Sequence, residues 1–125
     1  MLKYLVLIFV PAVIIAMLFL RAYAKGPSAK KFLKAVEEGN TQAVGSFIKK
    51  GIDANVRDAK FDEEQNTALI IASIYGHKDI VEMLLKAKAD PNARYDDGGN
   101  TALKLANQKG YTEIADILKN AGAKE

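Results

Sequence analysis

The side chains in this sequence that could do chemistry are few, and their spacing does not favour catalysis. His77 is the single histidine, and the chain has no cysteine, which removes disulfides, zinc–thiolate sites and thiol nucleophiles. A histidine without a second histidine or a cysteine makes a poor metal site, so we expect a structural role for His77. No Gly-x-Ser-x-Gly motif occurs, and Gly98-Gly99 precedes no Lys-Ser/Thr pair, so no phosphate loop is predicted. We therefore expect a protein that is not an enzyme, with no cofactor, no metal and no small-molecule substrate.

Acidic residues gather in two segments, which raises the question of calcium binding. They are Asp58, Asp62, Glu63, Glu64, Asp96 and Asp97. A calcium loop needs converging oxygens from an Asp-x-Asp-x-Asp-Gly-like run, and neither segment has one. We interpret these acids as solvated turn residues, with an acidic rim for a basic partner as the alternative.

The charge of the chain does not indicate a nucleic-acid partner. The net charge is +3, and acidic and basic residues are interleaved rather than separated into a basic tract. We expect no binding to nucleic acid.

A repeated tetrapeptide indicates how the chain is organised. Asn-Thr-Ala-Leu occurs at Asn66–Leu69 and again at Asn100–Leu103, a spacing of 34 residues. Identities continue at the same spacing, and a fainter copy lies 37 residues upstream of the middle one, as in Gly39 and Gly76. A period of 20–50 residues is typical of repeats that stack on their neighbours. The spacing predicts three units, residues 29–65, 66–99 and 100–123.

Each unit is expected to form two short helices. In the middle unit Thr67 is placed as an N-cap, and Gly76 is expected to end the first helix at a positive φ. A second helix is predicted over Asp79–Ala87, because its apolar residues recur at helical spacing, and Asp90-Pro91-Asn92 is expected to stop it. In the first unit, Ser28 is predicted to cap the first helix.

This pattern resembles the ankyrin repeat. The residues that match the family pattern in the middle unit are Thr67, Leu69, Ala72, Gly76-His77, Ile80-Val81, Leu84-Leu85, Ala89-Asp90 and Asn92. Those in the third unit are Gly99, Thr101, Leu103, Ala106, Gly110, Ile114, Leu118 and Gly122-Ala123. The resemblance implies an all-α solenoid of three helix-turn-helix repeats, with His77 hydrogen-bonded at the turn between helices.

The sequence departs from the family pattern at the start of each first helix. Ala68 and Ala102 stand where the family has proline, and Ile70 and Lys104 stand where it has histidine. The hydrogen bonds which that histidine makes in the family are therefore missing, and some loss of stability is expected. Three units are also about the minimum for a stable stack.

The N-terminal segment is predicted to be a membrane anchor. No charge occurs from Tyr4 to Leu20, and its twelve Leu, Ile, Val and Phe residues favour the bilayer by about 5 kcal/mol. That exceeds the cost of Pro11 in a helix interior, about 3 kcal/mol. We expect a single transmembrane helix within residues 1–24, a linker over 25–28 and a repeat domain over 29–125. The alternatives are a signal peptide cleaved after Ala22-Tyr23-Ala24, which Arg21 argues against, and a buried core helix.

The side of the membrane on which the repeat domain lies is predicted from the basic residues that flank the span. Five basic residues follow the span, and by the positive-inside rule they favour a cytoplasmic repeat domain in a single-pass, bacterial-type membrane protein. They are Arg21, Lys25, Lys30, Lys31 and Lys34. A periplasmic repeat domain is the alternative.

The resemblance also implies where a protein partner would bind. In ankyrin stacks the variable positions before the helix-ending glycine, together with the loop tips, line a concave face. The positions here include Glu37-Glu38, and we take as partner-binding residues Arg57, Phe61, Ile74, Tyr75, Arg94, Tyr95, Gln108 and Lys109. Tyrosine and arginine are enriched in binding hot spots. Packing against the neighbouring loop is the alternative role for these side chains.

Three functions follow as hypotheses. The first is a membrane-tethered module that binds an unidentified protein through this face. The second is a structural subunit of a membrane complex, assembled through the span, whose Pro11, Ala12 and Ala16 form a small-residue face. The third is an exported periplasmic protein that neutralises a toxin or protects against stress.

Overall fold

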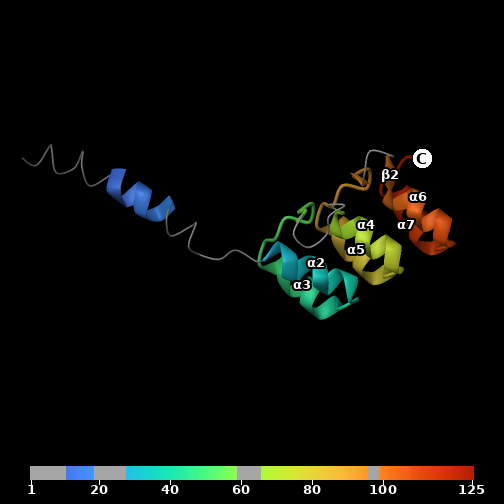
Figure 1. Ribbon diagram of the computed structural model, residues 1–125, viewed down its shortest axis with the longest axis horizontal. Coiled ribbons are helices and arrows are strands. Elements are labelled where there is room, and N and C mark those ends of the chain that lie inside the picture. The colour runs from blue at the N-terminus through green and yellow to red at the C-terminus, as the bar shows by residue number, and fades with distance from the viewer. Residues whose placement is uncertain (1–10, 19–27, 59–65, 96–98) are drawn as a thin grey trace, which may run out of the picture.

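A computed structural model describes residues 11–18, 28–58, 66–95 and 99–125 of the chain (Figure 1). From residue 28 onward the described part forms helix–turn–helix pairs that follow one another along the long axis. Their helices are α2 (Ala29–Glu37), α3 (Thr41–Lys49), α4 (Ala68–Tyr75), α5 (Lys78–Lys86), α6 (Ala102–Lys109) and α7 (Thr112–Asn120). The pairing is the one that the spacing of the sequence predicts.

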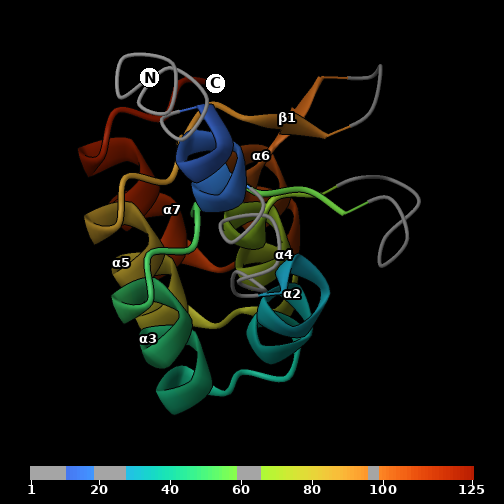
Figure 2. The same ribbon diagram turned by 90° about the vertical axis from the view of Figure 1, so that its left-hand side faces the viewer.

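The helices form two layers. The first helices of the pairs contact one another in the order α2, α4, α6, and the second helices contact one another in the order α3, α5, α7. Figure 2 shows α3, α5 and α7 along one side of the stack and α2, α4 and α6 along the other. Each unit therefore buries its apolar face against its neighbours, as stacked repeats do.

The predicted caps of the first helices are confirmed. Thr67 Oγ1 accepts from the Ile70 backbone N–H at 3.4 Å, and Thr101 Oγ1 caps α6 in the same way. Ser28 is the N-cap of α2. Gly76 ends α4 with φ of +72°, a left-handed conformation that favours glycine. These caps satisfy backbone groups that helix ends leave without partners.

The second helix of the middle unit differs from its predicted bounds. It begins at Lys78, with His77 as N-cap, and ends at Lys86 rather than Ala87. The chain leaves the helix at Lys88, whose φ of +71° lets the Ala89 N–H donate to the Leu84 carbonyl at 2.9 Å. The turn at Lys88 therefore ends the helix before Asp90-Pro91-Asn92 is reached.

A short hairpin was not predicted. β1 (Arg94–Tyr95) pairs antiparallel with β2 (Asn100–Thr101), with Arg94 opposite Thr101. Residues 96–98 between the strands lie outside the described residues. The part of the fold that the structure describes is all-α apart from this two-stranded ribbon.

The core runs through all three units. Phe32 and Phe47 meet edge to face with ring centroids 5.8 Å apart, and Phe32 is fully buried. Every residue of α4 from Ala68 to Ser73 is buried, because α2 and α6 flank this helix and α5 packs against it. Ile70, which replaces the expected family histidine, is 0% exposed, so it contributes apolar burial at that position.

The predicted membrane span is described only in its middle. Residues 11–18 are helical, and the large side chains there are at least half exposed. Within the described ranges, no helix has both the length and the apolar character needed to cross a membrane. Residues 4–10 and 19–20 of the predicted span lie outside those ranges, as do the predicted cleavage site and most of the linker.

Candidate partner-binding surface

The side chain of Asn55 holds the loop of the first unit to the second unit. Asn55 Oδ1 accepts from the Asp90 backbone N–H at 2.7 Å, and Asn55 Nδ2 donates to the Lys88 carbonyl at 3.1 Å. The Asn55 N–H in turn donates to Asp53 Oδ1 at 2.9 Å. This loop therefore has a fixed position against its neighbour, although it lies at the surface.

The same arrangement recurs one unit later. Asn92 Oδ1 accepts from the Lys124 backbone N–H at 2.9 Å, and Asn92 Nδ2 donates to the Gly122 carbonyl at 3.1 Å. Asn92 is thus the structural equivalent of Asn55. The two asparagines fix the loops that carry several of the predicted binding residues.

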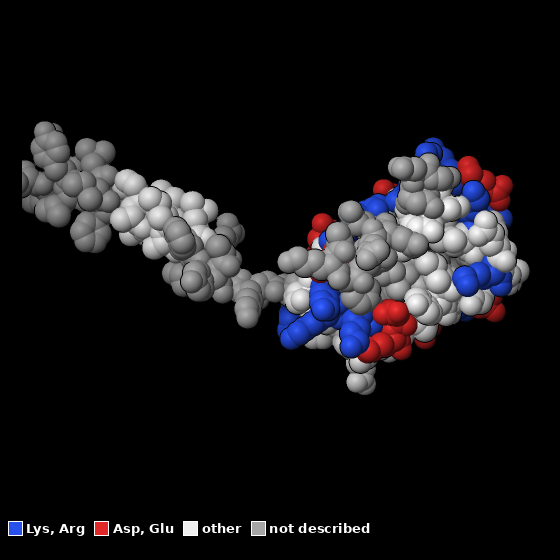
Figure 3. Space-filling model, in the orientation of Figure 1, with Lys and Arg blue, Asp and Glu red and all other residues white. Residues whose placement is uncertain are grey.

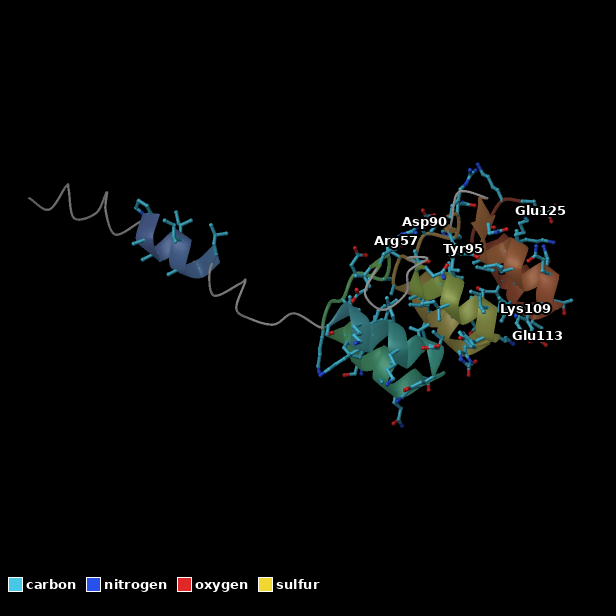
Figure 4. All side chains as sticks on the ribbon, viewed as in Figure 1. Arg57, Asp90, Tyr95, Lys109, Glu113 and Glu125 are labelled. Atoms are coloured by element: carbon cyan, nitrogen blue, oxygen red, sulfur yellow. The ribbon has the colours of Figure 1, made fainter. Side chains whose placement is uncertain are left out.

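Arg57 and the hairpin lie together at this end of the stack. Arg57 Nη2 donates to the backbone carbonyl of Arg94 at 3.0 Å, which ties the first loop to strand β1. Figure 4 shows Arg57 and Tyr95 on neighbouring loops. Tyr95 is half-buried and packs against the core, as Ile74 also does. For these two side chains the geometry favours the packing alternative over a free binding surface.

Tyr75 and His77 join the second unit to the first. Tyr75 Oη donates to Glu37 Oε1 at 3.1 Å, and its ring stacks on His77 with centroids 6.1 Å apart. His77 Nε2 lies 2.9 Å from the Glu37 carbonyl oxygen. A carbonyl can only accept, so we assign the proton to Nε2. His77 has the structural role expected for it, and Tyr75 remains 50% exposed.

A second packing role of His77 was missed in the sequence. A Cβ atom added to Gly39 would lie 2.8 Å from His77 Cε1, and one added to Gly76 would lie 2.9 Å from Tyr111 Cζ. Tyr111 therefore covers the helix-ending glycine of the second unit as His77 covers that of the first. The signal was present, because His77 and Tyr111 are 34 residues apart.

The predicted binding residues fall into two groups. Arg57, Arg94 and Tyr95 lie at the loop and hairpin end, whereas Ile74, Tyr75, Gln108 and Lys109 lie at the carboxyl ends of α4 and α6. Tyr95 belongs to strand β1 and Lys109 is the last residue of α6, and Figure 4 shows the two well apart. An eight-residue helix separates the groups by about 12 Å. Phe61 lies outside the described residues.

One hollow joins the two groups at the third unit. It has a volume of about 910 Å³, and its lining includes Arg94 from the hairpin and Gln108 from α6. The structure thus brings together two predicted binding residues that are far apart in sequence. The lining also includes Lys104 and Lys124, which the sequence did not single out for binding.

An ion pair joins the second and third units on the other layer. Lys78 Nζ lies 2.7 Å from Glu113 Oε2, and both side chains are exposed. This hydrogen bond, with the attraction between the two charges, raises the pKa of Lys78 and lowers the pKa of Glu113. Water screens such a pair, so we regard it as a minor link between units.

Metal binding has no support in the part of the chain that the structure describes. No group of three histidine, cysteine or acidic side chains converges there. Asp62, Glu63, Glu64, Asp96 and Asp97 lie outside it.

The family of the chain follows from its repeats. Residues 32–125 match the family described as ankyrin repeats in three copies. The chain belongs to the ankyrin-repeat family. The count of three units predicted from the spacing is thereby confirmed, and so is the solenoid fold. Ankyrin repeats generally bind protein partners, so the family indicates a protein–protein interaction module.

Proteins that share this ankyrin segment are much longer. The chain is 40% identical over 63 residues to serine/threonine-protein kinase 12 of Arabidopsis thaliana. The aligned segment covers 49% of this chain and 13% of the kinase. It is 35% identical over 77 residues to the mitochondrial disaggregase of Bos taurus, covering 60% of this chain and 11% of that protein. The human mitochondrial disaggregase matches at 35% over 79 residues, again 11% of its length. The similarity therefore concerns a small part of each relative.

Proposed function

We propose that this ankyrin-repeat protein is a non-enzymatic module that binds a protein partner while tethered to a membrane. The observation that carries the proposal is the surface formed by the ends of α4 and α6 and by the hairpin. Tyr75 is half exposed there, and Arg57 and Arg94 are exposed on loops that hydrogen bonds between units hold in place. A rigid surface with exposed tyrosine and arginine loses little conformational entropy when it binds.

The helix at residues 11–18 supports the tether. Val13, Ile14, Ile15, Met17 and Leu18 are each 50–66% exposed. Burial is worth about 1.5–3 kcal/mol for each such side chain, so an apolar environment would stabilise this helix. The uncharged run from Tyr4 to Leu20 supplies the remaining apolar residues for a bilayer. We place the repeat domain on the cytoplasmic side, because basic residues follow the run.

The binding surface is tested by capture of partners from membranes solubilised in mild detergent. With Tyr75→Ala and Arg94→Ala combined, recovery of the partner is expected to fall by about tenfold or more, since hot-spot residues cost at least about 1–2 kcal/mol each. Lys49→Ala with Lys50→Ala is the matched control, because both lysines are exposed on the α3 side. Equal recovery from all three proteins would exclude this surface.

A second function is favoured by the same exposed helix. The span itself, rather than the ankyrin face, would make the main contact in a membrane complex. Replacing residues 4–20 with an unrelated apolar helix distinguishes the two, because assembly through the span would be lost and binding through the repeats would be retained. Mass spectrometry of the mature N-terminus tests export with cleavage, for which a terminus at Lys25 is the expected product.

A further inference from the structure

The hollow at the third unit is a groove with three walls. The hairpin contributes Arg94 and Gly99, α6 contributes Lys104, and the C-terminal residues contribute Lys124. Its volume of about 910 Å³ is within the usual range for binding pockets, about 300–1,000 Å³. Figure 3 shows basic side chains interspersed with acidic ones at this end of the stack. We call this hollow the third-unit groove.

The described lining of the third-unit groove carries more positive than negative charge. Arg94, Lys104 and Lys124 form no ion pair with any residue that the structure describes. Glu125 is the one acidic side chain in the described lining, and its carboxylate lies 4.0 Å from Lys119 Nζ. Among the described residues, an incoming carboxylate would therefore meet three cations that no ion pair occupies.

Arg94 shows what kind of group the groove accepts. Arg57 and Arg94 are equivalent, since both lie two residues after the loop-fixing asparagines Asn55 and Asn92. Arg57 uses its guanidinium to hold a backbone carbonyl of the extended strand β1. The guanidinium of Arg94 has no such acceptor among the described residues. By analogy with Arg57 and strand β1, the space beside the Arg94 guanidinium thus fits an extended backbone.

The α6 wall has groups that suit a peptide backbone. Asn107 and Gln108 are exposed and line the groove, and the side-chain amide of neither has a hydrogen-bond partner in the described part of the chain. Each side-chain amide offers both a donor and an acceptor, which matches the alternating N–H and C=O groups of an extended peptide.

We propose that the third-unit groove binds an extended acidic segment of the protein partner. Carboxylates of that segment contact Arg94, Lys104 and Lys124, and its peptide groups hydrogen-bond to Asn107 and Gln108. This inference rests on the proposed function, because it names the class of partner that the module binds. An anionic bilayer fits less well, since a flat surface does not reach into a hollow.

The test uses the full chain in a neutral detergent and a fluorescein-labelled decapeptide of alternating glutamate and serine. Fluorescence polarisation gives its affinity, and a decapeptide of alternating glutamine and serine is the uncharged control. Arg94→Gln, Lys104→Gln and Lys124→Gln combined are expected to weaken binding of the acidic peptide by about tenfold or more, at up to about 1 kcal/mol for each exposed pair. Lys49→Gln, Lys50→Gln and Lys86→Gln remove the same charge elsewhere and are expected to change the affinity by less than about twofold.

The outcomes separate the possible explanations. Equal loss in the two triple variants, or equal binding of the two peptides, would overturn the proposal. So would tighter binding to vesicles of phosphatidylserine than to the acidic peptide, with the same dependence on Arg94, Lys104 and Lys124. Suppose that the wild-type chain binds no acidic peptide, but the variant with Lys104→Gln and Lys124→Gln still captures the protein partner. The proposal of an acidic segment is then wrong, whereas the proposed function as a protein-binding module is retained. If the wild-type chain captures no partner either, the proposed function fails as well. Circular dichroism checks that each variant is folded.

Discussion

At the residue scale, two aromatic side chains explain why the first helices of the first and second units are followed by glycine. His77 lies against Gly39, and Tyr111 lies against Gly76, each within 3 Å of where a Cβ would stand. Gly110 has the same left-handed backbone as Gly76 but has open space around it in the described structure. Glycine is therefore favoured at residues 39 and 76 for two reasons. It tolerates the positive φ, and it has no Cβ that would clash with the aromatic ring.

This difference gives a matched pair of substitutions. Gly76→Ala is expected to lower the free energy of unfolding by about 2 kcal/mol, because it adds a contact with the half-buried Tyr111 to the cost of a left-handed alanine. Gly110→Ala has a φ of +75° and only the backbone cost, about 1 kcal/mol. Urea denaturation measures both. Equal losses in the free energy of unfolding would show that the contact with Tyr111 does not add to the cost of Gly76→Ala.

Lys88 is the opposite case, a side chain at a position that suits glycine. Its φ is +71°, whereas Gly51 and Gly122 hold the equivalent turns of the other units at +85° and +97°. Lys88→Gly is expected to raise the free energy of unfolding by about 0.5–1 kcal/mol, because it relieves the left-handed strain. For a domain of this size that corresponds to a rise in melting temperature of about 2–8 °C. Lys88→Ala keeps the strained φ and is the control; a gain as large in this variant would contradict the explanation.

Individual residues were predictable where a local rule applies. Ser28, Thr67 and Gly76 were assigned as caps because N-caps and left-handed C-caps depend on nearby residues alone. The contact of Tyr111 with Gly76 depends on how one unit stacks on the next. The sequence therefore shows only that Tyr111 lies 34 residues after His77, and it does not show the contact with Gly76.

At the element scale, the paired helices were predicted and the hairpin was not. Helices of eight or nine residues carry enough periodic apolar positions to be recognised. β1 and β2 have two residues each, which is too short for an alternating pattern. The third-unit groove depends on that hairpin, so it could not be predicted either.

The helix at residues 11–18 gives a test of the membrane tether. Ile14→Arg with Ile15→Arg places two charges in the apolar run, each unfavourable for insertion by about 2.5–3.5 kcal/mol. Their sum offsets the predicted gain of about 5 kcal/mol, so the protein is expected to leave the membrane pellet after alkaline carbonate washing. Ile14→Leu with Ile15→Leu is expected to stay in the pellet. If the arginine variant also stays there, the tether is not this helix.

At the scale of the whole molecule, the ankyrin fold was recognisable from one spacing, because each unit repeats the same contacts with its neighbours. The binding surface was predictable only in part. Arg94 and Gln108 were selected separately, and the structure brings them to one groove with Lys104 and Lys124. No pattern in the sequence links these four positions, since they come from a hairpin, a helix and a C-terminal segment.

The central claim is that the protein partner contacts the face formed by the ends of α4 and α6 and by the hairpin. It is tested most directly by placing the photo-crosslinking residue p-benzoylphenylalanine at Tyr75 in one protein and at Lys49 in another. Both positions are exposed, and Lys49 lies on the α3 side of the stack. After irradiation of intact cells, we expect a discrete crosslinked partner from position 75 and none from position 49. A partner crosslinked from position 49 and absent from position 75 would contradict it.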